Sequence, residues 1–178
     1  MSRKLGIDEV RERWLPRPAP ESDRLEIEPQ NDRYSEPWHT RGCRALCLAA
    51  IAQIDTGYVI PSDKLEDMLL DMCLNERIVS CYNAATGIDE HQIINEAFAL
   101  AKHPERSSRQ VGVIRANGSD WNGDADHDYQ IVQYPTSGEV GTHFVLCDAD
   151  QHLLYDPWFG DDLITGPATA WLFYKVWR

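Results

Sequence analysis

Long apolar runs and an excess of basic residues are both missing from this chain of 178 residues. No apolar stretch approaches the ~18 residues that a membrane-spanning helix needs, and the first residues, MSRKLGIDE, lack the apolar core of a secretory signal peptide. The 17 lysines and arginines are outnumbered by 29 aspartates and glutamates, so the formal net charge is −12. Because binding to a phosphate backbone needs a basic face, we expect no nucleic-acid partner. We also expect no membrane partner, and a location in the cytoplasm or delivery by a route other than Sec.

Cysteine pairs of the CxxC type are absent, and the number of cysteines, five, is odd. Without such pairs neither a zinc ribbon nor a thioredoxin-type motif is supported. An odd count in a chain of this length does not indicate a disulfide framework. Most free cysteines are buried and act as small apolar side chains, which is the expectation for Cys73 and Cys147. We expect no metal ion and no cofactor.

One acidic segment invites a metal interpretation. Asp124, Asp126 and Asp128 have the alternate spacing of an EF-hand calcium loop. The position that such a loop fills with glycine is Tyr129, and the position of its last glutamate is Pro135. The pattern therefore favours a solvated acidic loop.

The chain divides into an arm and a domain. Residues 1–36 are rich in proline, glutamate and arginine after a short helix predicted over 7–15, which indicates an extended or partly disordered arm. Residues 37–178 are predicted to form one domain of α+β class, in which a buried central helix packs on a C-terminal antiparallel sheet. The periodicities predict helices at 44–54, 62–73 and 89–101, and strands at 110–116, 129–134, 143–148, 152–156 and 169–177.

Cys43 stands directly before the apolar helix predicted over 44–54. A nucleophilic cysteine reacts as the thiolate, and a helix N-terminus lowers the pKa of a thiol through its free N–H groups and its dipole. A single cysteine before an alanine-rich helix is more often structural. The assignment of Cys43 as a nucleophile therefore depends on partners elsewhere in the chain.

His143 and Asp156 are the partners that a cysteine nucleophile needs. A histidine can accept the thiol proton and later protonate a leaving group, and an aspartate can hold the imidazole in one tautomer. His143 begins one predicted strand and Asp156 ends the next, with a tight turn at 149–151 between them. An antiparallel hairpin of this length brings Asp156 back alongside His143, so the three residues form a candidate Cys-His-Asp triad.

Two motifs in the chain carry a family resemblance. Residues 42–51 read GCRALCLAAI, and residues 141–146 read GTHFVL, followed by YDPW at 155–158. They resemble the papain-like cysteine peptidase superfamily, and within it the bacteriocin-leader (double-glycine) peptidases. Those families begin their central helix with a motif of the type DCGPACLA, and they have Gly-His-Phe/Tyr-Val-Val followed by Asp-Pro.

The resemblance implies a papain-like fold and a cysteine-dependent amide hydrolase, either a peptidase or an amidase, that works through a thioester acyl-enzyme. It implies Cys43 as the nucleophile, His143 as the base and Asp156 as the orienting group. Trp158 takes the place of the aromatic residue that covers the Asp–His hydrogen bond in the wider superfamily.

Two positions depart from the family pattern. Arg44 replaces the glycine that follows the nucleophile, and Pro37 stands where the oxyanion glutamine is expected. The second oxyanion donor would then come from Trp38, from His39 or from a backbone N–H group, and one donor is worth ~10²–10³ in rate. Two alternatives stay open: a transglutaminase- or deamidase-type acyl transferase with the same triad, and a catalytically degenerate papain-like module that binds a partner.

The charges near Cys43 differ in sign from those in the segment that contains His143 and Asp156. Arg41 and Arg44 flank Cys43, whereas the other two triad residues lie in the stretch 116–174, which has ten acidic residues and no lysine or arginine. This pattern predicts a cleft that is cationic near the nucleophile and anionic near the base. The expected partner is a protein or peptide substrate, with lysine or arginine near the scissile bond.

Overall fold

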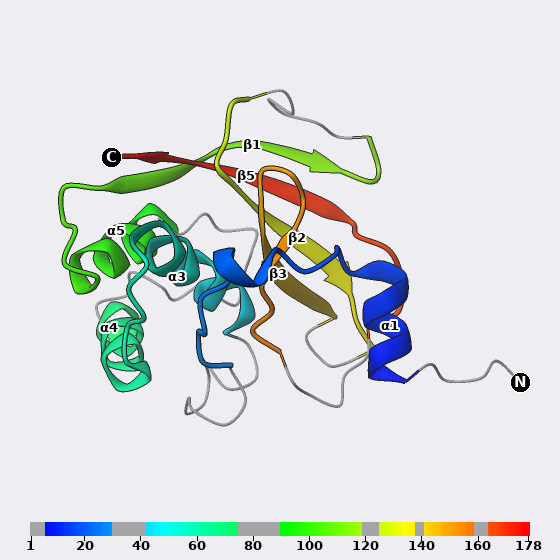
Figure 1. Cartoon of the computed structure of the whole chain (residues 1–178), viewed down its shortest axis with the longest axis horizontal. Coiled ribbons are helices and arrows are strands. Elements are labelled where there is room, and N and C mark those ends of the chain that lie inside the picture. The colour runs from blue at the N-terminus through cyan, green and yellow to red at the C-terminus, as the bar shows by residue number, and fades with distance from the viewer. Residues whose placement is uncertain (1–5, 30–41, 75–89, 119–124, 138–140, 159–163) are drawn as a thin grey trace, which may run out of the picture.

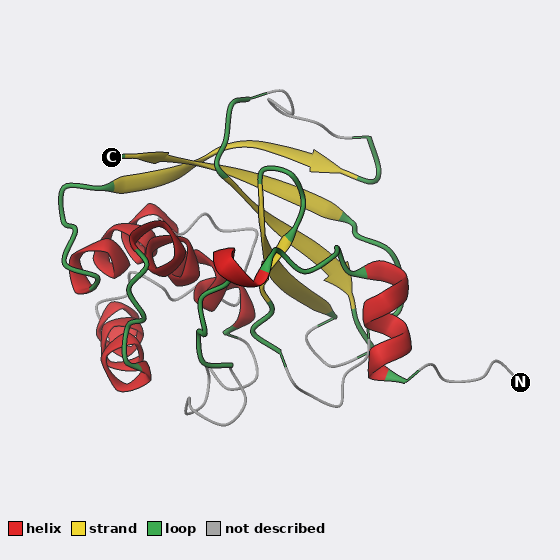
Figure 2. Cartoon of the chain, viewed as in Figure 1, coloured by secondary structure: helices red, strands yellow, loops and turns green. Residues whose placement is uncertain are grey.

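The computed structural model describes six stretches of the chain, which together form an α+β domain (Figure 1, Figure 2). Three helices pack on one face of a five-stranded antiparallel sheet, and an N-terminal helix packs on the other. The predicted α+β class, with helices before an antiparallel sheet, is therefore confirmed. The stretches are residues 6–29, 42–74, 90–118, 125–137, 141–158 and 164–178.

The central helix is α3 (Cys43–Thr56), and its alanines and leucines are buried almost without interruption as far as Gln53. It ends at Gly57, whose φ of +69° is a left-handed conformation that glycine adopts without a Cβ clash. α4 (Ser62–Leu74) and α5 (Glu90–Leu100) follow; α5 packs against both α3 and β1, and α3 itself packs directly against β3. Each predicted helix is confirmed, and no described helix is long and apolar enough to cross a membrane.

The sheet contains five strands in the order β1-β5-β2-β3-β4, and every neighbouring pair is antiparallel. β1 has a bulge between Gln110 and Gly112. All five predicted strands are present, with bounds that differ by a few residues. They are β1 (Ser107–Arg115), β2 (Tyr129–Pro135), β3 (Thr142–Asp148), β4 (Leu153–Tyr155) and β5 (Ala170–Trp177).

The sheet is buried on both faces. Ile131 of β2 and Leu146 of β3 belong to the core formed with the helices, whereas their neighbours Val132 and Val145 belong to a second cluster. Successive strand residues point to opposite faces, so the two clusters lie on opposite sides. Val10 of α1 is 1 % exposed and completes the second cluster.

The N-terminal arm follows the domain surface. α1 (Ile7–Trp14) confirms the predicted short helix, and a 3-10 turn, η1 (Glu21–Asp23), comes after it. Between them the chain lies parallel to β4: Leu153 N–H donates to the Arg17 carbonyl and Ala19 N–H donates to the Leu153 carbonyl, both at 2.8 Å. The arm thus covers the edge of β4, whose backbone groups would otherwise lack strand partners. The predicted boundary between residues 36 and 37 lies outside the described residues.

Candidate active site

Cys43 is the first residue of α3. The Gly42 carbonyl already accepts the N–H of Leu46 at 2.8 Å, so the helix begins at this point. The N–H groups of a first helical turn have no partners within the helix, and the helix dipole is positive there. The Cys43 side chain therefore lies at the positive end of the α3 dipole, and only 6 % of the residue is exposed.

His143 and Asp156 come together through the β3–β4 hairpin. Asp148 shapes the turn, because its Oδ1 accepts the N–H of His152 at 2.7 Å. Gln151, with a φ of +66°, completes the reversal. β4 then runs back along β3, and Asp156 follows its last residue. The hairpin expected from the sequence is present.

The three predicted triad residues meet at the His143 ring. His143 Nε2 lies 2.8 Å from Asp156 Oδ1, and the Cys43 side chain lies close enough to the same imidazole to raise its pKa. Because Asp156 occupies Nε2, Nδ1 is the ring nitrogen that can exchange a proton with Cys43. The Trp158 ring lies beside the imidazole, with centroids 5.0 Å apart and planes at 45°, which is the neighbourhood expected for this tryptophan.

The environment of His143 favours its protonated form. Burial on its own lowers the pKa of this imidazole, since only 3 % of the residue is exposed. The hydrogen bonds with Asp156 and Cys43, together with their charges, outweigh burial and raise the pKa to about 9. At neutral pH the ring is therefore an imidazolium held between a carboxylate and a sulfur atom.

This pKa predicts a pH dependence of stability. A folded-state pKa near 9, against about 6.5 in the unfolded chain, adds stability that is complete below pH ~6.5 and is lost as the pH rises through ~9. The size is on the order of 3 kcal/mol. Urea unfolding at pH 6.5 and 9.5 should therefore show that the free energy of unfolding falls more for the wild type than for His143→Gln. An equal fall in the two proteins would contradict the raised pKa of His143.

Asp156 has further partners that the sequence did not reveal. Its Oδ1 also accepts the N–H of Trp158 at 3.0 Å. A guanidinium nitrogen of Arg11, from α1, lies 3.5 Å from Asp156 Oδ2 and donates to the Trp158 carbonyl at 3.1 Å. No local pattern marks Arg11, because 145 positions separate it from Asp156.

Two other buried cysteines, Cys47 and Cys147, are neutral thiols. Cys47, one turn after Cys43, is fully buried and donates to the Phe144 carbonyl at 3.5 Å. Burial raises the pKa of Cys47 well above its usual value, and it raises the pKa of Cys147 to about 12. Neither is suited to act as a nucleophile at neutral pH.

Arg44 belongs to a structural cluster. Its guanidinium forms an ion pair with Glu90 of α5 and lies 5.4 Å from the Phe144 ring centroid. Glu90 also accepts the Tyr174 hydroxyl at 2.7 Å. Burial and then the Glu90 charge raise the pKa of Tyr174 well above its usual value, so the hydroxyl stays a donor. Arg44 thus ties α3 to α5 and β5.

The two described arginines near the candidate site each face a carboxylate. Glu90 balances the charge of Arg44, and Arg11 stands next to the carboxylate of Asp156. Arg41, the other arginine of the predicted cationic side, lies outside the described residues. The predicted polarity of the cleft, and with it the preference for a basic substrate, therefore stays a prediction.

The predicted supporting residues Trp38 and His39 also lie outside the described residues. Among the described residues, the backbone N–H of Cys43 lies at the N-terminus of α3, where it has no partner within the helix. Backbone N–H groups at such a position stabilise the negative oxygen that forms when a carbonyl is attacked.

The aspartates of the acidic loop face a lysine. Lys175 Nζ lies 2.9 Å from Asp126 Oδ2 and 3.5 Å from Asp128 Oδ2, and Asp124 lies outside the described residues. Among the side chains that the structure describes, no group of three His, Cys, Asp or Glu residues could hold a metal ion. Asp126 and Asp128 thus share the ammonium group of Lys175 from β5.

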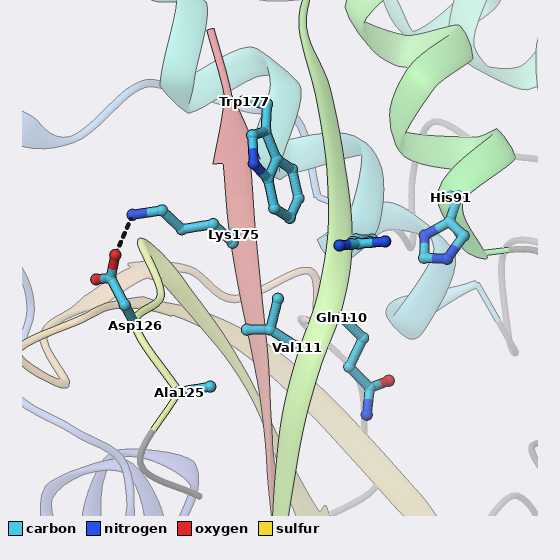
Figure 3. A pocket seen from close by; sticks show the side chains of 8 residues that line it. His91, Gln110, Val111, Ala125, Asp126, Lys175 and Trp177 are labelled. Atoms are coloured by element: carbon cyan, nitrogen blue, oxygen red, sulfur yellow. Dashed lines mark ion pairs between the residues drawn. The ribbon is translucent and has the colours of Figure 1, made fainter. Parts of the chain in front are cut away.

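A pocket of about 730 Å³ lies beside this lysine (Figure 3). Its walls come from the start of α5, from β1, from the end of β5 and from residues 125–126. None of the triad residues lines it, so it is separate from the candidate site. The lining residues are His91, Arg109, Gln110, Val111, Ala125, Asp126, Lys175 and Trp177.

Comparison with known proteins gave no matching family model, no matching curated protein and no matching solved structure. The geometry around His143 therefore carries the functional argument.

Proposed function

We propose that the protein is a cysteine-dependent amide hydrolase of papain-like type, with a protein or peptide substrate. The observation that carries the proposal is the buried His143 ring, whose Nε2 lies 2.8 Å from Asp156 Oδ1 and whose pKa is raised by the neighbouring Cys43 side chain. A buried histidine between a carboxylate and a helix-terminal cysteine is the arrangement that cysteine acyl-transfer chemistry requires.

The first half-reaction is acylation. Cys43 Sγ attacks the carbonyl carbon of the amide, and the C=O electron pair moves to the oxygen, which the backbone N–H of Cys43 stabilises. The tetrahedral intermediate collapses, the C–N bond breaks, and the nitrogen takes the proton of the His143 imidazolium. An amine leaves, and a thioester on Cys43 remains.

The second half-reaction is hydrolysis of that thioester. A water molecule attacks the thioester carbon while His143 takes one of its protons. The second intermediate collapses to a carboxylic acid and restores the Cys43 thiolate beside the His143 imidazolium. Asp156 keeps the imidazole in one tautomer through both steps.

The architecture supports the papain-like assignment. The chain order is a buried central helix that begins with the cysteine, then a strand whose second residue is the histidine, then the aspartate directly after the return strand. α3 packs against β3, so the two motifs that resemble the family lie on neighbouring elements.

Acylation with an activated ester tests the proposal without knowledge of the peptide substrate. p-Nitrophenyl acetate should be turned over, and after acid quenching mass spectrometry should find one acetyl group on the peptide that contains Cys43. Cys43→Ala should lose both signals. Cys47→Ala, one turn along the same helix, is the matched control and should keep them.

Three results would count against the proposal. Turnover that survives Cys43→Ala contradicts the nucleophile. A folded wild-type protein with no acetyl group on Cys43 contradicts catalysis and favours a papain-like binding module. Faster transfer of the acetyl group to an added amine than to water contradicts hydrolysis and favours a transglutaminase-type reaction.

A further inference from the structure

The N-terminal arm contacts the candidate site directly. Arg11 lies on α1, and its guanidinium reaches both the Asp156 carboxylate and the Trp158 carbonyl. Trp158 in turn lies against the His143 ring. One arginine of the arm thus bridges the orienting carboxylate and the residue that covers the imidazole.

The carboxylate of Asp156 is occupied on both oxygens. Oδ1 receives His143 and the Trp158 N–H, and Oδ2 faces Arg11. Contacts on both oxygens fix the rotation of the carboxylate about its Cβ–Cγ bond, which a single hydrogen bond to the imidazole does not do. The orientation of Asp156 therefore depends on an element outside the β3–β4 hairpin.

A cavity explains why Oδ2 needs this partner. A space of about 880 Å³ lies between the arm and β4, and both Arg11 and Asp156 line it. Without the arginine, Oδ2 would face this open space and would exchange hydrogen bonds with solvent. The guanidinium replaces that solvent with a fixed donor, and 12 % of the Asp156 side chain remains exposed.

The arm is held in place by apolar contacts from α1 itself and by backbone hydrogen bonds directly after α1. Val10 and Trp14 pack into the cluster on the outer face of the sheet. Beyond α1, Leu153 exchanges two backbone hydrogen bonds with Arg17 and Ala19. Because Leu153 begins β4 and Asp156 directly follows β4, the same arm contacts both the strand and the carboxylate.

We infer that Arg11 is a positioning residue of the active site, which makes the N-terminal arm part of the catalytic unit. The inference rests on the proposed function for its consequence in rate. In structural terms, the inference says that Asp156 and His143 keep their relative orientation only when Arg11 is present.

Substitutions on one helix test this inference in the full-length protein. Arg11→Ala should lower turnover of p-nitrophenyl acetate about 10-fold, less than the ~10² that a 1 Å misplacement can cost. Arg11→Lys keeps the charge but not the fork of donors, so it should recover part of the loss. Arg13→Ala removes an exposed arginine of the same helix and should leave turnover unchanged.

A spectroscopic signal separates positioning from loss of stability. The Nε2 proton that His143 shares with Asp156 should give a far-downfield proton resonance in NMR, which His143→Gln should lack. Arg11→Ala should shift or broaden this resonance, and Arg13→Ala should leave it in place. A loosened α1 that only lowered stability would not move it in the folded protein.

The outcomes distinguish the positioning role of Arg11 from the proposed function. If the wild type acetylates Cys43 but Arg11→Ala changes neither the rate nor the resonance, the positioning role is overturned and the proposed function stands. An equal loss of rate in Arg13→Ala also overturns it. If Cys43 is never acetylated while the resonance responds to Arg11→Ala, the positioning contact is supported and the proposed function fails.

Discussion

Replacing Asp156 with asparagine is expected to lower the turnover of p-nitrophenyl acetate by on the order of 10³-fold. Asparagine keeps the shape of the side chain but presents an amide NH₂ or a neutral oxygen to His143 Nε2, so the imidazole loses its fixed tautomer and its counter-charge. The same change in a Ser-His-Asp triad lowers kcat by about 10⁴. A smaller loss is expected here because a thiolate is already a strong nucleophile.

The measurement is the steady-state rate of p-nitrophenyl acetate hydrolysis at pH 7, with circular dichroism to show that the variant is folded. Asp150→Asn provides a matched control, because Asp150 is exposed in the turn of the same hairpin. That control should stay within about twofold of the wild type. A rate for Asp156→Asn within about threefold of the wild type would remove Asp156 from the catalytic mechanism.

Replacing Arg44 with methionine is expected to lower the free energy of unfolding by about 3 kcal/mol. Methionine fills much of the same volume but carries no charge. Glu90 then keeps the Tyr174 hydroxyl as its described hydrogen-bond partner, at a position where the Arg44 and Glu90 side chains are each only 19 % exposed. The cost of an uncompensated, mostly buried carboxylate exceeds the gain that the ion pair itself provides.

Urea unfolding of a double-mutant cycle measures this effect. Arg44→Met combined with Glu90→Gln should recover much of the lost stability, because the unpaired charge is then absent. Arg24→Met, at an exposed position of the arm, should change stability by less than about 0.5 kcal/mol. Unchanged stability together with lost acylation of Cys43 would instead show that Arg44 acts in the chemistry.

The elements of the fold were predictable because local patterns specify them. α3 combines an uninterrupted apolar sequence with Gly57 at its end, and the strands carry alternating or continuous apolar residues. The bounds were less predictable. β1 begins at Ser107, three residues before the predicted start, because pairing with Trp177 and Val176 extends the strand into polar sequence.

The candidate site was predictable only in part. Cys43, His143 and Asp156 each stand at the boundary of an element, where chemistry-bearing side chains can be recognised from the sequence. Arg11 has no such mark, since its contact depends on how a proline-rich arm lies on the domain. The pairing of Arg44 with Glu90 was not foreseen either, because it depends on how α5 packs against α3, and Arg44 was expected to act on the thiol.

The two edges of the sheet bear on how the molecules behave at high concentration. Sheets of separate molecules join into ribbons only if each molecule offers two accessible edges. Here the arm occupies the edge of β4, and the edge at β1 carries a bulge and the exposed side chains of Arg109 and Arg115. The segment that reaches Asp156 thus also caps the sheet against end-to-end growth, and a truncation that removes it would expose a strand that self-association can use.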